Sequence, residues 1–168
     1  MLLSSVPAEG DAELKTVATG GIAGLLATLI MSACMLAADY LGWMNEQPPK
    51  TITSRVARKA GMPVSGASLD VATGMAHLGF GIVGGSAFGL IARRLPSLPA
   101  SALVGVGYGL LIWATSYLAI LPSLDLMPGP AEGERRRTPV MLFAHIVYGA
   151  ALGIAGYVMQ RRSLSPRP

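Results

Sequence analysis

Residues 76–81 read AHLGFG and residues 144–149 read AHIVYG, so one short pattern occurs twice, 68 positions apart. The match continues without a gap to the arginine pairs at 93–94 and 161–162. Each copy lies in an apolar stretch and contains one of the two histidines of the chain. The sequence therefore predicts an internal duplication of a helical hairpin, with one imidazole at the same place in each copy.

Four long stretches are nearly free of charged residues, and they decide the class of protein. They cover residues 17–41, 71–92, 100–121 and 139–160. A helix of 22 residues is about 33 Å long, which is enough to cross a hydrocarbon core of about 30 Å. Charged residues make up only 13% of the chain, and the mean hydropathy is +0.53. Soluble domains carry about 25% charged residues, so we expect four transmembrane helices rather than buried helices of a soluble protein.

The predicted fold class is all-α, a four-transmembrane-helix bundle built from two tandem helical-hairpin repeats. We expect residues 1–16 to be a polar lead, residues 17–162 to form a single transmembrane domain, and residues 163–168 to be a disordered tail. The first repeat covers about residues 17–94 and the second about residues 100–162. Because each repeat crosses the membrane twice, the two copies share one orientation and are related by an axis along the membrane normal.

The connector between the first two spans carries a pattern of its own. Ile52 and Val56 are four positions apart among four basic residues. This spacing is typical of a short amphipathic helix lying on lipid headgroups, here over residues 50–61. The alternative is a simple solvated connector.

The basic residues lie in loops beside the spans, so the net charge of +4 indicates contact with anionic headgroups rather than nucleic acid. Seven basic residues fall on one side and six on the other, so the positive-inside rule does not choose an orientation. We expect both termini on the same side, the cytoplasmic one, because the two Arg-Arg pairs adjoin the hydrocarbon directly. The expected partners are the lipid bilayer and either a second copy or a larger membrane complex.

Glycines recur four positions apart along the predicted spans. In lipid no hydrophobic force drives helices together, so close approach through small residues is the main attraction. His77 shares a helical face with Gly81, and His145 shares one with Gly149. We therefore expect both imidazoles to face a packed interface, most simply with the second and fourth spans side by side at the centre. The glycines expected in helix packing are Gly20, Gly24, Gly81, Gly85, Gly89, Gly149 and Gly153.

The candidate intramembrane polar site consists of His77, His145, Asp39 and Asp70. Ionisable groups inside a membrane are costly and commonly mark a pathway, and the nearby helix N-terminus favours a neutral imidazole. Three interpretations stay open. Each histidine hydrogen-bonds a neighbouring backbone group or aspartate across the helix interface and fixes the packing, or the pair handles protons or ions, or the pair ligates haem b axially.

Motifs of other chemistry do not occur in the sequence. We find no phosphate-binding loop after a strand, no CxxC, no HExxH and no Ser-His-Asp set that could converge outside the lipid. We therefore expect no catalytic residue, no metal site and no cofactor.

The order of features resembles the YagU family of small bacterial inner-membrane proteins over most of residues 17–162. The resemblance implies an all-helical inner-membrane protein of undefined molecular activity, with a link to acid tolerance, and no catalytic residues can be carried over. The third span has Trp113 and Tyr117 but no histidine, which weakens a proton relay drawn from relatives. The resemblance rests on the Gly-rich first span, Pro48-Pro49, the span His77–Ala92, Leu95-Pro96, Leu121-Pro122, Leu126-Met127-Pro128, Ala144-His145 and Arg161-Arg162.

We therefore expect a non-enzymatic, multi-pass protein of a bacterial inner membrane that is a structural or accessory component, linked to acid or envelope stress tolerance. The alternative is a small transporter or proton-linked membrane protein that uses His77 and His145. The third interpretation is a membrane protein that binds haem b between the same two histidines.

Overall fold

The computed structural model describes residues 9–44, 47–129 and 136–164, and these residues form helices and loops without a strand. Helices α4, η1 and α5 follow one another without a break and form one span. Four spans are thus long and apolar enough to cross a membrane. The predicted all-α four-helix bundle is confirmed. The elements are α1 (Glu9–Tyr40), α2 (Pro48–Lys59), α3 (Gly66–Ala92), α4 (Leu98–Ala114), η1 (Thr115–Ile120), α5 (Leu121–Ser123) and α6 (Arg137–Leu164).

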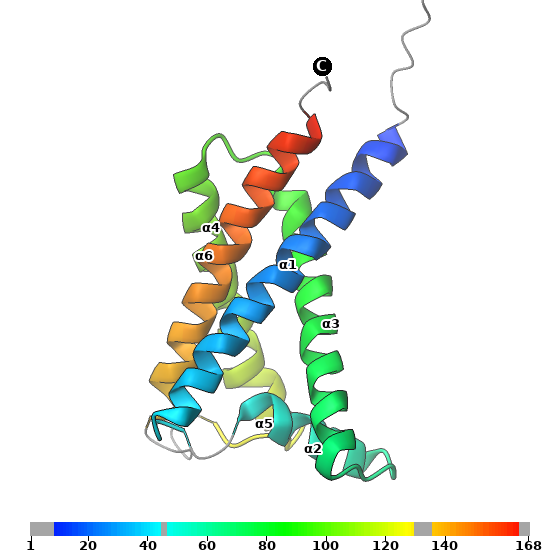
Figure 1. Cartoon of the computed structure of the whole chain (residues 1–168), viewed down its shortest axis with the longest axis vertical. Coiled ribbons are helices and arrows are strands. Elements are labelled where there is room, and N and C mark those ends of the chain that lie inside the picture. Colours follow the sequence, from blue (N-terminus) through cyan, green and yellow to red (C-terminus); the bar gives the residue numbers. More distant parts are fainter. Residues whose placement is uncertain (1–8, 45–46, 130–135, 165–168) are drawn as a thin grey trace, which may run out of the picture.

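Helix α1 packs against both α3 and α6, and α4 packs along α6 (Figure 1). Helices α3 and α6 touch only slightly. The expectation that the second and fourth spans lie side by side at the centre is therefore wrong. The physical reason is that the glycine faces are used within each hairpin. Gly85 of α3 meets the backbone of Gly24 in α1, and Gly149 of α6 meets the backbone of Gly105 in α4.

Each of the seven glycines expected in packing faces a neighbouring helix at very short range. A Cβ atom on Gly20 or Gly24 would collide with the backbone of α3, and one on Gly153 would collide with the backbone at Ser101 of α4. The partner glycines on α4 are Gly105 and Gly109. Both hairpins therefore close through paired glycines, as a duplicated hairpin would, although the duplication itself stays a prediction.

The ends of two spans differ from the expected boundaries. Helix α1 begins at Glu9, so residues 9–16 of the expected polar lead are helical. Alanine, glutamate, leucine and lysine are good helix formers, and three acidic residues here suit the positive end of the helix dipole. Helix α6 continues to Leu164, two residues into the expected tail. Residues 1–8 and 165–168 lie outside the described residues.

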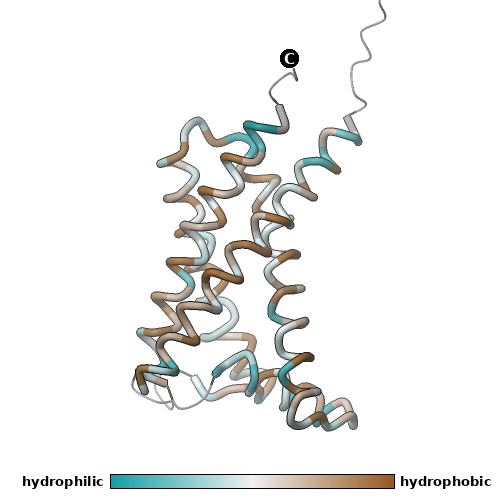
Figure 2. Tube along the Cα trace, in the orientation of Figure 1, coloured by the Kyte–Doolittle hydropathy of each residue, from teal (hydrophilic) through white to brown (hydrophobic). Residues whose placement is uncertain are grey.

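Helix α2 is the expected short helix between the first two spans. It begins at two prolines, which suit the first turn because they need no hydrogen-bond acceptor for an N–H there. Pro48 and Thr51 are buried, whereas Arg58 and Lys59 are exposed. Figure 1 shows α2 and α5 at the end of the bundle opposite the end of α6, and Figure 2 shows hydrophilic residues gathered at both ends. The middle of the bundle is the apolar part, as a membrane requires.

The third span widens into a π-helical turn over Thr115–Ile120. Pro122 follows this turn and has no N–H to donate to the carbonyl four residues earlier, at Leu118. The hydroxyl of Thr115 donates to the carbonyl oxygens of Leu111 (2.8 Å) and Ile112 (3.2 Å). Such widened turns occur often at functional sites, and this one contributes Ser116 and Tyr117 to the cavity described below.

Candidate functional site

Each histidine makes one hydrogen bond, through Nδ1 of its ring. His77 in α3 lies with Nδ1 3.2 Å from the hydroxyl oxygen of Ser32 in α1. His145 in α6 lies with Nδ1 2.8 Å from the carbonyl oxygen of Met141 in the same helix. Among the described residues, no hydrogen bond reaches the Nε2 atom of either ring.

The bond to Met141 shows which ring nitrogen of His145 carries the hydrogen atom. A carbonyl oxygen can only accept a hydrogen bond, so the Nδ1–H of His145 donates to it. In a neutral imidazole the other nitrogen, Nε2, then carries a lone pair and can only accept. The hydroxyl of Ser32 both donates and accepts, so the same argument does not fix the proton of His77.

Both histidines line one cavity of about 280 Å³ between the helices. Every helix contributes to its wall, and α2 contributes Pro49 and Ile52. Most of the lining side chains are apolar or aromatic, and the hydroxyls of Thr28 and Ser116 are among the few polar groups besides the imidazoles. A mainly apolar cavity with a few convergent polar groups is the usual form of a site for a small molecule.

An aromatic pair forms the wall contributed by the third span. The rings of Trp113 and Tyr117 are stacked with their centroids 5.9 Å apart. The indole N–H of Trp113 is buried and has no hydrogen-bond partner among the described residues. Tyr117 is held from behind by Arg137, whose Nε donates to its hydroxyl and whose guanidinium carbon lies 5.6 Å from the ring centroid. The start of α6 thereby positions the π-helical turn.

Arg137 is itself buried, with 7% of its surface exposed. Its second contact runs from Nη2 to the carbonyl oxygen of Pro128, at 3.1 Å. A buried guanidinium must be hydrogen-bonded, because an unpaired buried charge is very costly. Tyr117 and Pro128 therefore both accept hydrogen bonds from the buried guanidinium of Arg137.

A second hollow, of about 700 Å³, lies between α1, α2 and α3, and many of the side chains that line it are polar. Asp39, Lys50, Asp70 and Thr73 line this polar groove, and so does His77. His77 therefore belongs both to the apolar cavity and to the polar groove. His145 lines only the cavity.

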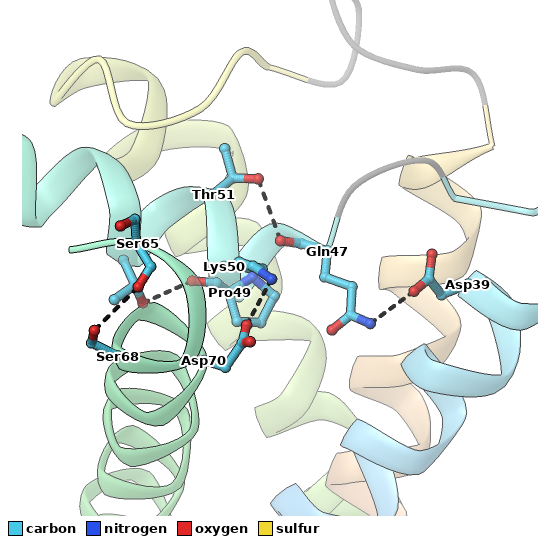
Figure 3. Close-up of polar contacts among 9 residues, drawn as sticks. Asp39, Gln47, Pro49, Lys50, Thr51, Ser65, Ser68 and Asp70 are labelled. Carbon is cyan, nitrogen blue, oxygen red and sulfur yellow. Dashed lines mark hydrogen bonds and ion pairs between the residues drawn. The ribbon is translucent and has the colours of Figure 1, made fainter.

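The two aspartates of the candidate site fasten the start of α2 between α1 and α3 (Figure 3). The Nε2 amide of Gln47 donates to Asp39 at 3.0 Å, and Lys50 pairs with Asp70 at 2.6 Å. Both aspartates are exposed. The four expected site residues thus lie in two neighbouring places, with His77 shared, His145 in the cavity, and the aspartates in the groove.

Among the residues that the structure describes, no group of three or more His, Cys, Asp or Glu side chains could hold a metal ion. The two imidazoles line one cavity, so a metal complex bound there would have to supply its other ligands itself, as a haem does.

Part of this site was not predicted from the sequence. Ser32, Thr28 and Ser116 are polar residues inside spans, but nothing in their spacing assigns Ser32 to His77 or the others to the cavity. Arg137 appeared to belong to the loop charge, because a sequence does not show that its side chain turns back into the bundle.

Comparison with known proteins gives a family and no activity. A model for a family of unknown function, DUF6789, matches residues 14–165. The chain belongs to the DUF6789 family. No curated protein and no solved structure matches it significantly. The matched residues include His77, His145 and the other residues that line the cavity.

Proposed function

We propose that this chain is a non-enzymatic accessory protein of a bacterial inner membrane that binds a small, mainly apolar molecule in the cavity between His77 and His145. The observation that carries the proposal is the pair of imidazoles facing one apolar cavity, each with one nitrogen held and Nε2 without a partner among the described residues. If the histidines only fixed the packing, the bonds to Ser32 and Met141 would suffice, and no cavity would be needed beside them.

The chemistry of His145 limits the class of ligand. Because Nε2 of its neutral ring accepts, the ligand has to present a hydroxyl, an amine or another N–H or O–H donor to it. The remaining wall is apolar, so the rest of the ligand is aromatic or aliphatic. A molecule of this kind partitions into the membrane and can reach the cavity from there.

The proposal also includes the orientation in the membrane, the family resemblance and the assembly that were expected from the sequence. We place both termini in the cytoplasm, because the Arg-Arg pairs adjoin the spans at the end of the bundle where α6 ends. The YagU resemblance and its link to acid or envelope stress tolerance also belong to the proposal, as does assembly with a second copy or a membrane complex. The matched family, of unknown function, leaves these assignments to experiment.

The second candidate is a proton-linked membrane protein that uses the same two histidines. The observation that favours it is the polar groove, which leads from the exposed Asp39 and Asp70 to His77. A proton could pass from this groove to His77 and across the cavity to the free nitrogen of His145.

The binding proposal is tested with 1-aminoanthracene, a small aromatic amine whose fluorescence rises in apolar surroundings. We expect saturable binding to the purified protein, and a decrease in affinity of about two- to tenfold in His145→Phe, because one hydrogen bond is lost. Anthracene has no N–H, so its competition for the site should be unchanged by the same substitution. Ser116→Phe should fill the cavity and abolish binding, whereas Leu118→Phe, on an exposed position two residues away, should not.

Three results would contradict this proposal. Equal binding by Ser116→Phe and Leu118→Phe would mean that the probe does not enter the cavity. A Soret band in the purified protein that His145→Phe abolishes would replace the proposal by haem ligation. Dissipation of a pH gradient by wild-type proteoliposomes, lost in His77→Phe while the probe does not bind, would replace it by proton transfer.

A further inference from the structure

A third hollow, of about 540 Å³, lies between the end of α1 and the start of α6. Ala38 and Ala144 are buried and form its floor, and the exposed side chains of Leu41 and Phe143 form its walls. Small residues on both helices leave a groove on the outside of the bundle, away from the histidine cavity. We call it the α1–α6 groove.

The α1–α6 groove lies at the end of a span, where hydrocarbon meets headgroups. It is on the same end of the bundle as α2, where the cyan end of α1 lies beside the start of α6 (Figure 1). Trp43, with 49% of its surface exposed, lines it just beyond the end of α1. Tryptophan is enriched at this level of a membrane because its ring is amphipathic.

One charged side chain lines the α1–α6 groove among the described residues, the exposed Arg136. It stands immediately before α6, so the positive end of that helix lies at the same mouth. No aspartate or glutamate is among the described lining residues, and Asp39 of α1 faces the polar groove instead. Among the described residues, the mouth therefore carries a positive charge, and the groove behind it is apolar.

We propose that the α1–α6 groove binds an anionic phospholipid, with an acyl chain along Ala38 and Ala144 and the phosphate at Arg136. The charge of the mouth matches a phosphate, and the apolar floor matches a chain that is already present in the surrounding membrane. A basic side chain beside a transmembrane helix attracts an anionic headgroup by its charge. The proposal rests on the chain spanning a membrane and is independent of any ligand in the histidine cavity.

The test uses the detergent-purified full chain incubated with equal amounts of phosphatidylglycerol and phosphatidylcholine of the same acyl composition, followed by native mass spectrometry. We expect the protein to retain phosphatidylglycerol in clear excess. Arg136→Gln should reduce this excess by about fivefold, the effect of one basic group near a membrane surface. Arg94→Gln is the matched control, because Arg94 is also exposed but lines none of the three hollows.

A second pair of variants tests the apolar part. Ala37→Trp should fill the groove and reduce the retention of both lipids, whereas Val83→Trp, on an exposed face of α3, should not. Equal retention of the two lipids by the wild-type protein would overturn the proposal without any variant. Equal effects of Arg136→Gln and Arg94→Gln, or undiminished retention by Ala37→Trp, would also overturn it.

Discussion

Replacing Gly105 with leucine is expected to separate α4 from α6 and to lower the free energy of unfolding by about 3 kcal/mol or more. A Cβ atom at this position would collide with the backbone of Gly149 and Gly153, and a backbone cannot move aside as the end of a flexible side chain can. The midpoint of thermal unfolding in detergent, followed by circular dichroism, should fall by about 10 °C.

Gly107 provides the matched control on the same helix. It lies two positions away, it is exposed, and a Cβ atom there would meet nothing within 4 Å. Gly107→Leu should therefore leave the unfolding midpoint nearly unchanged. If both variants unfolded at the same temperature, the close packing of α4 on α6 through Gly105 would be refuted.

Replacing Tyr117 with phenylalanine is expected to lower the free energy of unfolding by about 2 kcal/mol. Phenylalanine keeps the ring under the guanidinium of Arg137 but removes the hydroxyl that accepts its Nε–H. The substitution therefore leaves a buried charged donor without its acceptor, and the penalty is larger than for a neutral hydrogen bond. Chemical unfolding in a mild detergent measures the change.

Tyr40→Phe is the control for this substitution, because Tyr40 has 91% of its surface exposed at the end of α1. It should change the free energy of unfolding by less than about 0.5 kcal/mol. A Tyr117→Phe variant as stable as the Tyr40→Phe variant would show that Arg137 does not depend on the hydroxyl of Tyr117.

The spans could be predicted from the sequence because their signal is local. Long uncharged stretches and paired glycines identify helices that cross a membrane and pack closely, whatever their neighbours are. The order of the helices around the centre is not local. The glycines of α3 could equally face α6 or α1, and only the fit of Gly24 against Gly81 and Gly85 decides for α1.

For the histidines too, the sequence indicated the residues themselves but not the residues that they contact. Their repeated context drew attention to His77 and His145, and the structure places both at one cavity. His145 does bond a backbone group, but the acceptor is Met141 in its own helix rather than a group across a helix interface. Ser32 lies 45 positions before His77, and nothing in the sequence pairs the two. Arg137 escaped prediction because only the fold brings its side chain to Tyr117. Pro122 indicated the end of the third span but did not show that the turn before it is π-helical.

The central claim is that His77 and His145 face one binding cavity, and histidine-selective ¹⁵N NMR tests it most directly. The chain has only these two histidines, so a protein labelled in histidine alone gives ring signals from the candidate site and nowhere else. We predict that Nε2 of His145 is unprotonated. We also predict that the ¹⁵N chemical shifts of both rings change on addition of 1-aminoanthracene, and that neither changes in Ser116→Phe. Ring signals that stay unchanged in the wild-type protein at saturating probe, or a shift of one ring alone, would contradict a cavity shared by the two histidines.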